Sequence, residues 1–446
     1  MLMDLFGAFT HIFEKSYSEY FKYPYEGDIL SSIEALKNKK KPDIEPINQY
    51  NYSYIHDIKD YCVDNNYHTL RLIFLVKSAC ENFHRRKAIR NSWGYKKRFF
   101  DVPTRTVFLL GKHNNDDELK MKIDEESKTY KDIMQVDFID SYYNNTIKTM
   151  IGFRWAVTYC LNAKYYMFVD DDIYVSVKNV LRFIRNPASY PDYLKEPSRI
   201  GSLKREIRKS DMPNFTELPI NNTNNIIINN QEYDNLNTSH RINNISNNNQ
   251  LIRFKDKSVW RFYNNTKMSI NANANIELGE IKNEKEESNS NEVIDEINSR
   301  VDNTLIRNSR QIFDFELPDD VRLFAGYVFI SSPHRHKTSK WYVTLNEYAY
   351  DMWPPYVTAG AYILSKEALV DMYYTSFYTK HFRFDDIFLG LVAKKADIEP
   401  FHCDEFHFYK KDYTKVNYKY VITSHGYGDP DELLNVWNEQ KSLGNA

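Results

Sequence analysis

Short apolar runs alternate with helical patterns along most of the chain. Three runs rich in β-branched and aromatic residues, each bounded by polar turns, predict β-strands at residues 71–79, 104–111 and 133–140. Residues 146–162 follow a broadly helical pattern, and the apolar run at 164–169 predicts the next strand. This order of strand, helix and strand predicts a largely parallel sheet with helices on both faces.

The same pattern resumes in the C-terminal part of the chain. Residues 323–331 predict a strand, and residues 356–374 predict a strand that leads into a helix. Residues 385–398 have a helical pattern, and the segment 424–440 ends in a short amphipathic helix. The predicted fold class is therefore α/β, in which ligands bind at the carboxyl ends of the strands.

Two segments do not follow this pattern. Residues 1–68 mix charged residues, Pro and Tyr without sustained periodicity, so we interpret them as a stem or irregular N-terminal extension. Residues 203–317 are rich in Asn and charged residues and offer little apolar surface to offset the entropy of ordering. We therefore predict one domain over residues 69–446, interrupted at 203–317 by a disordered insertion in a surface loop.

The composition limits the classes of partner. Hydrophobic residues make up 42% of the 446 residues and aromatic residues 15%, which is enough for a sizeable core and for pockets lined by rings. The formal net charge is −2, so no global basic field attracts nucleic acid or an anionic membrane. The four cysteines lie far apart without CxxC spacing, which disfavours a zinc ribbon and leaves one or two disulfides open.

The compartment is indicated by asparagine glycosylation acceptors of the N-x-S/T type, which favour a secretory route. Most of them lie in the Asn-rich tract, where chance matches are frequent, but Asn144 does not. The N-terminal apolar run is broken by Asp4 and His11 and is too short to span a bilayer. We therefore expect the chain as given either to be soluble or to lack its true start.

The clearest chemical signal is the triplet Asp170, Asp171 and Asp172, directly after the predicted strand at 164–169. Three converging carboxylates repel one another when charged, and a divalent cation removes that cost. Magnesium and manganese take oxygen ligands and bridge phosphate oxygens, so the triplet suits a metal that holds a nucleotide diphosphate. The alternative is a solvated acidic turn, but the position at the end of a strand favours the metal site.

Several sequence blocks, in the same order, resemble the beta-1,3-glycosyltransferase family. This family includes beta-1,3-galactosyltransferases and beta-1,3-N-acetylglucosaminyltransferases, with Fringe as a more distant relative. The blocks are RRKAIRNSW (85–93), EESKTYKDIMQVDFIDSYYNNTIKT (125–149), YYMFVDDDIYV (165–175), SKWYVTLNEYAYDMWPPYVTAGAYILS (339–365) and FDDIFLG (384–390). One block alone is a weak match, whereas their order and spacing together are specific.

The resemblance implies a GT-A type fold, a UDP-sugar donor and Mn²⁺. It implies a hexosyltransferase that moves galactose or an N-acetylhexosamine, with inversion, to the 3-hydroxyl of an acceptor glycan on a glycoprotein or glycolipid. It also implies a Golgi membrane location with a luminal catalytic domain, although the sequence shows no spanning segment. Asn144 coincides with the family's N-L-T acceptor, so we expect glycosylation there.

The resemblance also suggests which residues hold the donor and its metal. Asp172 is the expected metal ligand, and His425 matches a family histidine that completes the metal shell, although a lone His is usually structural. Asp170 is expected to face the donor ribose or the metal's waters, with Asp171 beside it at the donor site.

Basic residues are expected to contribute to the same donor site. Arg86 and Arg90 are four residues apart and can share one helix face, where guanidinium groups suit phosphate or a uracil carbonyl. The alternative for this pair is a solvated basic face. Lys148 falls near the donor in the family pattern.

Asp386 matches the candidate base of the family. Inversion by a single displacement requires the attacking hydroxyl to lose its proton to a carboxylate across from the leaving UDP. Asp385, its neighbour, can raise one pKa of the pair. The alternative is that the two aspartates only cap a helix.

Aromatic residues upstream of this pair are expected to form the acceptor or donor-sugar pocket. Aromatic faces stack on sugar rings and Gly permits close backbone approach, whereas core packing is the alternative for each Trp. The predicted pocket residues are Trp341, Trp353, Tyr356, Gly360 and Asp385.

Two other classes of protein fit these residues less well than a transferase does. A catalytically inactive glycan-binding or chaperone-like relative needs neither a metal nor a base, so Asp170 to Asp172 and Asp386 argue against it. A metal phosphoesterase normally recruits more His and Asp ligands for two metals, and few His residues lie near the triplet.

Overall fold

The computed structural model describes six stretches of the chain, with the backbone of two short strands in addition. The stretches are 10–22, 27–63, 69–95, 102–113, 116–195 and 317–446. The two strands, β7 (Asn249–Arg253) and β8 (Trp260–Asn264), form an antiparallel pair. Apart from this pair and Leu317, the predicted insertion at 203–317 lies outside the described residues.

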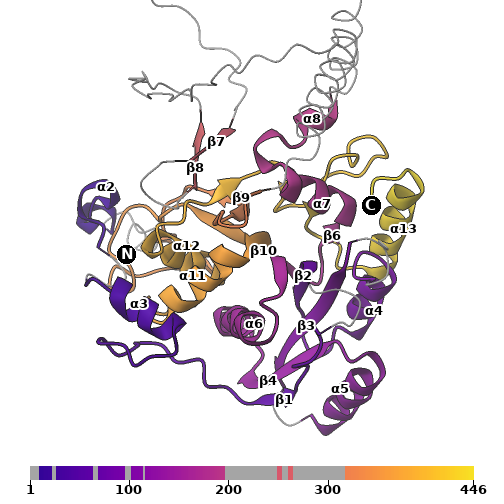
Figure 1. Cartoon of the computed structure of the whole chain (residues 1–446), viewed down its shortest axis with the longest axis horizontal. Helices are drawn as coiled ribbons and strands as arrows, with labels where there is room; N and C mark the ends of the chain where they lie inside the picture. Colours follow the sequence, from indigo (N-terminus) through magenta and orange to yellow (C-terminus); the bar gives the residue numbers. More distant parts are fainter. Residues whose placement is uncertain are drawn as a thin grey trace, which may run out of the picture.

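One eight-stranded sheet forms the centre of the molecule, in the order β1-β4-β3-β2-β5-β10-β9-β11 (Figure 1). Its parallel half consists of β2 (Leu70–Lys77), β3 (Thr104–Lys112), β4 (Ile133–Ile139) and β5 (Ala163–Asp170). These strands occupy the apolar runs in which the sequence predicts strands, and they confirm the α/β fold class. A short strand, β1 (Tyr54–His56), adds to β4 in the antiparallel direction.

In the second half of the sheet, one strand reverses direction while its neighbours stay parallel to β5. The strand β10 (Tyr356–Ser365) runs antiparallel to both β5 and β9 (Phe324–Phe329), and β11 (Phe401–His402) closes the edge parallel to β9. The start of β10 therefore lies beside the carboxyl end of β5. A small three-stranded sheet has the order β12 (Phe406–His407), β13 (Thr423–Ser424) and β6 (Tyr174–Val175). In the chain, β6 follows β5 and β12 follows β11.

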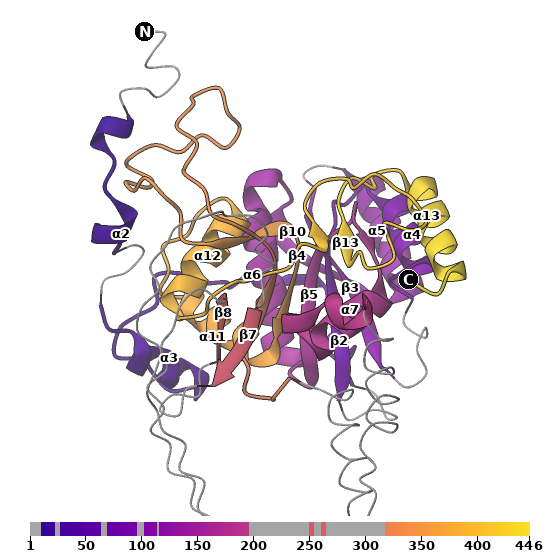
Figure 2. The same ribbon diagram turned by 90° about the horizontal axis from the view of Figure 1, so that it is seen from above.

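Helices cover both faces of the sheet (Figure 2). One face packs on α6 (Asn145–Tyr159), α11 (Lys366–Ser376) and α12 (Asp385–Lys395). The other packs on α4 (Phe83–Asn91), α5 (Asp117–Tyr130), α7 (Val177–Arg185) and α13 (Pro430–Ser442). Ile73 and Leu75 of β2 point into the first core, and Phe74 and Val76 into the second. Burial on both faces explains why this strand is a continuous apolar run.

The N-terminal extension packs against this domain. The helix α3 (Leu30–Lys37) contacts α11, where the Lys37 ammonium lies 2.6 Å from Asp371 Oδ1. Closer to the N-terminus lie a 3₁₀ turn, η1 (His11–Phe13), and the short helix α2 (Tyr17–Tyr20). Because β1 belongs to the central sheet, the extension is in part continuous with the domain predicted over residues 69–446. Three further short helices are η2 (Tyr142–Asn144), η3 (Pro187–Ser189) and α8 (Asp192–Lys195).

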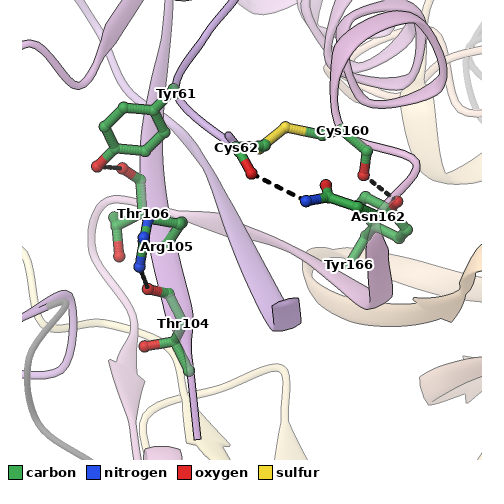
Figure 3. Close-up of a disulfide and its surroundings, with 8 residues drawn as sticks. All are labelled: Tyr61, Cys62, Thr104, Arg105, Thr106, Cys160, Asn162 and Tyr166. Atoms are coloured by element: carbon green, nitrogen blue, oxygen red, sulfur yellow. Dashed lines mark hydrogen bonds between the residues drawn. A yellow bond between two sulfur atoms is a disulfide. The ribbon is translucent and has the colours of Figure 1, made fainter. Parts of the chain in front are cut away.

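A disulfide links Cys62 to Cys160 and ties the N-terminal extension to the end of α6 (Figure 3). Asn162 Nδ2 donates to the Cys62 carbonyl (2.9 Å), and the Tyr166 hydroxyl donates to the Cys160 carbonyl (2.6 Å). Of the one or two disulfides left open by the sequence, the structure contains this one. Cys80 and Cys403 are buried free thiols.

In the described part of the chain, every helix is too short or too polar to cross a bilayer.

We expect the disulfide to contribute to stability, because it closes a loop of 98 residues and so restricts the unfolded chain. Cys62→Ser should lower the free energy of unfolding by about 2 to 5 kcal/mol. Urea unfolding with and without a reductant measures this. The reductant should destabilise the unmodified protein and a Cys80→Ala control, but should not destabilise Cys62→Ser further. Equal sensitivity of all three proteins would contradict the expectation.

Candidate active site

A cavity of about 480 Å³ opens at the carboxyl end of β5. Its lining includes side chains from the triplet, from the start of α12 and from the segment between β9 and β10. The predicted site residues that line it are Asp170, Trp341, Trp353, Tyr356, Gly360, Asp385, Asp386 and His425. The fold thus brings together residues that lie up to 255 positions apart (170 to 425).

The ammonium group of Lys77 lies between two of these carboxylates. Lys77 ends β2 and pairs in register with Asp170, the last residue of β5. Its Nζ lies 3.0 Å from Asp170 Oδ1 and 2.9 Å from Asp385 Oδ2, and it donates to the Ala359 carbonyl (2.9 Å). Burial disfavours the charge on Lys77, but the carboxylates of Asp170 and Asp385 outweigh that effect and raise its pKa. Sequence reasoning missed Lys77, whose only signal is a lysine closing a buried strand.

Asp385 and Asp386 occupy the first turn of α12, where the helix dipole favours negative charge. Asp385 is buried and accepts from Thr149 Oγ1 (3.0 Å) as well as from Lys77. Asp386 lines the cavity, and its Oδ1 accepts from the Ile387 backbone N–H (2.8 Å). Burial and the adjacent negative charge of Asp385 raise the pKa of Asp386 to about 7. A carboxyl group with such a pKa can accept a proton near neutral pH.

Asp170 also titrates near neutrality. Burial raises the pKa of Asp170 to about 7, and the charges of Asp172 and Asp385 add to this effect, whereas Lys77 opposes it. The side chain keeps 34% of its surface exposed, and that surface faces the cavity. Directly beside it, Gly360 leaves space: a Cβ there would lie 4.0 Å from Asp170 Oδ2. The cavity can therefore receive a ligand close to this carboxyl group.

Asp171 points away from the cavity. Its Oδ2 accepts from Ser78 Oγ (2.6 Å) and Asn82 Nδ2 (2.9 Å), and its Oδ1 accepts from Arg85 Nη1 (3.0 Å). Arg85 also donates to the Gly428 carbonyl (3.1 Å). Asp171 therefore joins the loop after β2 to the segment before α13, and the acidic triplet is divided between different contacts.

Asp172 and His425, the two predicted metal ligands, lie close to each other, although only His425 lines the cavity. His425 Nε2 lies 3.5 Å from Asp172 Oδ2, and the two side chains are 42% and 25% exposed. The Tyr427 backbone N–H donates to the Asp172 carbonyl (2.8 Å), which fixes the two segments together. Within the described stretches, no group of three His, Cys, Asp or Glu side chains is spaced to hold a metal. One carboxylate oxygen and one imidazole nitrogen still fit Mn²⁺, which commonly completes its shell with substrate phosphates and water.

Three predicted donor-binding residues lie outside the cavity lining. Arg86 is fully buried and forms an ion pair with Glu126 (2.7 Å), while Arg90 pairs with Glu126 (2.6 Å) and Asp132 (2.8 Å). Lys148 lies 2.7 Å from Asp140 Oδ1. Arg86 donates to the Ala79 carbonyl and Lys148 to the Ser78 carbonyl, so both brace the loop that follows β2.

The two predicted tryptophans occupy different environments. Trp341 is 45% exposed, and its Nε1 donates to the Tyr142 hydroxyl (2.9 Å). Trp353 is only 4% exposed and packs on Tyr348, with ring centroids 3.9 Å apart. Tyr356 is hydrogen-bonded through its hydroxyl to Ser331 Oγ (3.0 Å). Trp341 thus presents an aromatic face at the rim, whereas Trp353 is part of the wall.

Asn144 lies at the start of α6, and its Nδ2 donates to the Ile139 carbonyl (2.7 Å). Thr146, the third residue of its acceptor motif, is buried and donates to the Phe382 carbonyl (2.8 Å).

Known proteins are similar to this chain in sequence. Residues 84–206 and 308–404 match the Galactosyltransferase family. The beta-1,3-galactosyltransferase brn of Drosophila melanogaster is 32% identical over 455 residues, which cover 100% of this chain and 94% of the relative. Human beta-1,3-galactosyltransferase 1 is 24% identical, covering 89% of this chain and 81% of the relative.

A third relative is similar over a shorter stretch. Human lactosylceramide 1,3-N-acetyl-beta-D-glucosaminyltransferase is 37% identical over 140 residues, or 30% of this chain and 36% of the relative. The family predicted from the sequence blocks is confirmed, and neither an inactive relative nor a phosphoesterase is favoured by any of these matches. The chain belongs to the Galactosyltransferase family and is a glycosyltransferase with the mixed α/β sheet of a GT-A type fold.

Proposed function

We propose that this enzyme transfers galactose, or an N-acetylhexosamine, from a UDP-sugar to the 3-hydroxyl of an acceptor glycan with inversion of configuration. The observation that carries this proposal is the position of Asp386, a cavity carboxyl group whose pKa is raised to about 7. The names of the relatives support the β-1,3 linkage and both kinds of donor sugar.

Asp386 acts as the general base in this proposal. The acceptor hydroxyl oxygen attacks the anomeric carbon of the donor sugar, its proton passes to Asp386, and the bond from that carbon to the diphosphate oxygen breaks. Lys77 and Thr149 hold Asp385 in place, so the start of α12 presents Asp386 to the cavity in a fixed orientation. Proton transfer of this kind contributes about 10²- to 10⁴-fold to the rate.

The donor diphosphate is held at the other end of the acidic triplet. Asp172 and His425 would bind Mn²⁺, which supplies positive charge to the departing UDP. Asp170 contributes a hydrogen-bonding carboxyl group beside Gly360, where the donor sugar has room. Arg86, Arg90 and Lys148 support this donor site indirectly, through the loop after β2.

The acceptor enters past the exposed rim of the cavity. Trp341 offers a ring face there, and Tyr142, which is hydrogen-bonded to it, also lines the cavity. Aromatic faces suit the apolar faces of sugar rings. The wall behind this rim contains Trp353 and Tyr356.

The proposed location is the Golgi lumen, with association with its membrane. The Cys62–Cys160 disulfide supports an oxidising compartment, because disulfides persist in secreted and luminal proteins. Glycosylation of Asn144, which the sequence motif predicts, would agree with the same route.

Replacing the base should abolish transfer while leaving donor binding intact. We expect Asp386→Asn to lower kcat at least about 100-fold, because the acceptor hydroxyl then has no group to take its proton. UDP release is measured with a panel of UDP-sugars and glycan acceptors in the presence of Mn²⁺. Asp397→Asn, an exposed change at the end of α12, is the matched control. Undetectable UDP release by the unmodified enzyme with every donor and acceptor would refute the transferase proposal.

The reaction should depend on pH through the cavity carboxyl groups. Because the pKa of Asp386 is about 7, the base is protonated at lower pH, and kcat/KM should fall as the pH decreases below about 7. Asp385→Asn removes a negative charge that raises the pKa of both Asp386 and Asp170. The acid limb of the variant's pH profile, where kcat/KM falls, should therefore move to lower pH. A pH profile from 5 to 9 compares the two enzymes, and a limb at the same pH in both would contradict this assignment.

Loss of either proposed metal ligand should weaken the binding of Mn²⁺. We expect Asp172→Ala and His425→Ala to raise the Mn²⁺ concentration needed for half-maximal UDP release at least about tenfold, since even outer contacts change metal affinity 10- to 100-fold. His402→Ala is the control, because His402 pairs with Asp404 and does not line the cavity. Equal Mn²⁺ titrations for all four proteins would exclude this pair as the metal site.

A further inference from the structure

The segment 331–353 connects β9 to β10 without a helix or strand of its own. Long loops of this kind are uncommon in compact domains and are usually functional. Its cavity-lining side chains are Ser331, Ser332, His334, Trp341, Val343 and Trp353. Because this loop supplies so much of the wall, its shape decides whether the rim and wall are in place.

Arg335 organises the inside of this loop. Its side chain is 1% exposed. The guanidinium donates to the backbone carbonyls of Val343 (2.9 Å), Tyr348 (2.8 Å) and Tyr350 (3.0 Å). One buried cation thus holds three separated points of the loop together.

The counter-charge of Arg335 comes from the N-terminal segment. Arg335 Nε donates to Glu14 Oε1 (2.7 Å), a residue 321 positions earlier in the chain. The Glu14 side chain is 7% exposed, and its second oxygen lies 2.8 Å from His11 Nδ1. A buried ion pair that loses one partner leaves an uncompensated charge, which is strongly unfavourable.

Backbone contacts extend the same attachment. The Lys15 N–H donates to the Ala349 carbonyl (2.9 Å), and the Asp351 N–H donates to the Lys15 carbonyl (3.0 Å). The Tyr17 N–H donates to Asp351 Oδ1 (2.8 Å). Figures 1 and 2 show the short helix α2 beside this part of the chain. Residues 10–22, which we call the N-terminal clamp, therefore lie along the outer side of the loop.

The attachment reaches the cavity through aromatic packing. Tyr348, whose carbonyl accepts from Arg335, packs against Trp353 with ring centroids 3.9 Å apart and the rings tilted by 33°. The Trp353 N–H donates to the Ser331 carbonyl (3.0 Å), which returns the loop to the end of β9. Displacement of Arg335 would thus shift a wall residue of the cavity.

We propose that the N-terminal clamp is a positioning element of the active site, which holds loop 331–353 in its acceptor-binding shape through the Glu14–Arg335 ion pair. Glu14 and Arg335 touch no reacting atom; they act through Val343 and Trp353, which line the cavity. The inference rests on the proposed function for the identity of the acceptor side, whereas the attachment itself is independent of it.

The test compares Glu14→Gln with Lys37→Met in the full chain. Lys37 belongs to another ion pair between the N-terminal extension and the domain, with Asp371 on α11, away from the loop. Glu14→Gln should raise the acceptor KM about tenfold, since small misplacements in a site have large kinetic effects, with the donor KM unchanged. Hydrogen exchange in peptides from 331–353 should become faster, and peptides from 356–376 should be unaffected. Lys37→Met should change neither the acceptor KM nor the loop exchange.

An unchanged acceptor KM in a folded Glu14→Gln protein would overturn the proposal, whatever the exchange shows. Should that variant fail to fold, Asp351→Asn weakens a second clamp contact, and the same pair of measurements applies. Hydrogen exchange needs no activity. If the unmodified protein releases no UDP but Glu14→Gln makes hydrogen exchange in the loop faster, the proposed function is refuted and the attachment is retained. Unchanged exchange would refute the attachment itself.

Discussion

A buried ammonium group connects the two halves of this enzyme at its cavity. Lys77 comes from the parallel half of the sheet. Its Nζ lies 3.0 Å from Asp170 Oδ1 of β5 and 2.9 Å from Asp385 Oδ2 of α12. Buried charges are costly unless they are paired and hydrogen-bonded, so the three groups specify one another's positions. The strand order, the start of α12 and the backbone at Ala359 must all converge on this point. Burial, together with the charge of Asp385, raises the pKa of the neighbouring Asp386.

The helices and strands near the cavity could be predicted because their patterns are local. Strands such as β2 and β5 are buried on both faces and read as continuous apolar runs. The antiparallel direction of β10 was not predicted, because periodicity gives the existence of a strand and not its partner. The sequence blocks identified the family, and all five pocket residues predicted from the sequence line the cavity.

The individual contacts could not be predicted, because they depend on residues distant in the chain. Arg86 carries a helical spacing suited to phosphate, but the residue that neutralises it, Glu126, lies 40 positions later. Asp171 looks equivalent to its neighbours in the sequence, yet Ser78, Asn82 and Arg85 take up its oxygens. The N-terminal extension has little periodicity of its own. Contacts with distant residues, such as that of Glu14 with Arg335, hold it in place instead. Its assignment as a stem and the roles of the site residues stay predictions.

The cavity is built from both sides of the Asn-rich tract. Segments before the tract supply Lys77, Asp170 and the rim residue Tyr142, whereas segments after it supply Asp385, Asp386 and the loop around Trp341 and Trp353. With the proposed roles, loop 331–353 is divided from the carboxylates, so changes in it can alter acceptor choice without disturbing them. Such a division allows one scaffold to diversify: acceptor preference can evolve in loop 331–353 while the chemistry of sugar activation is inherited unchanged.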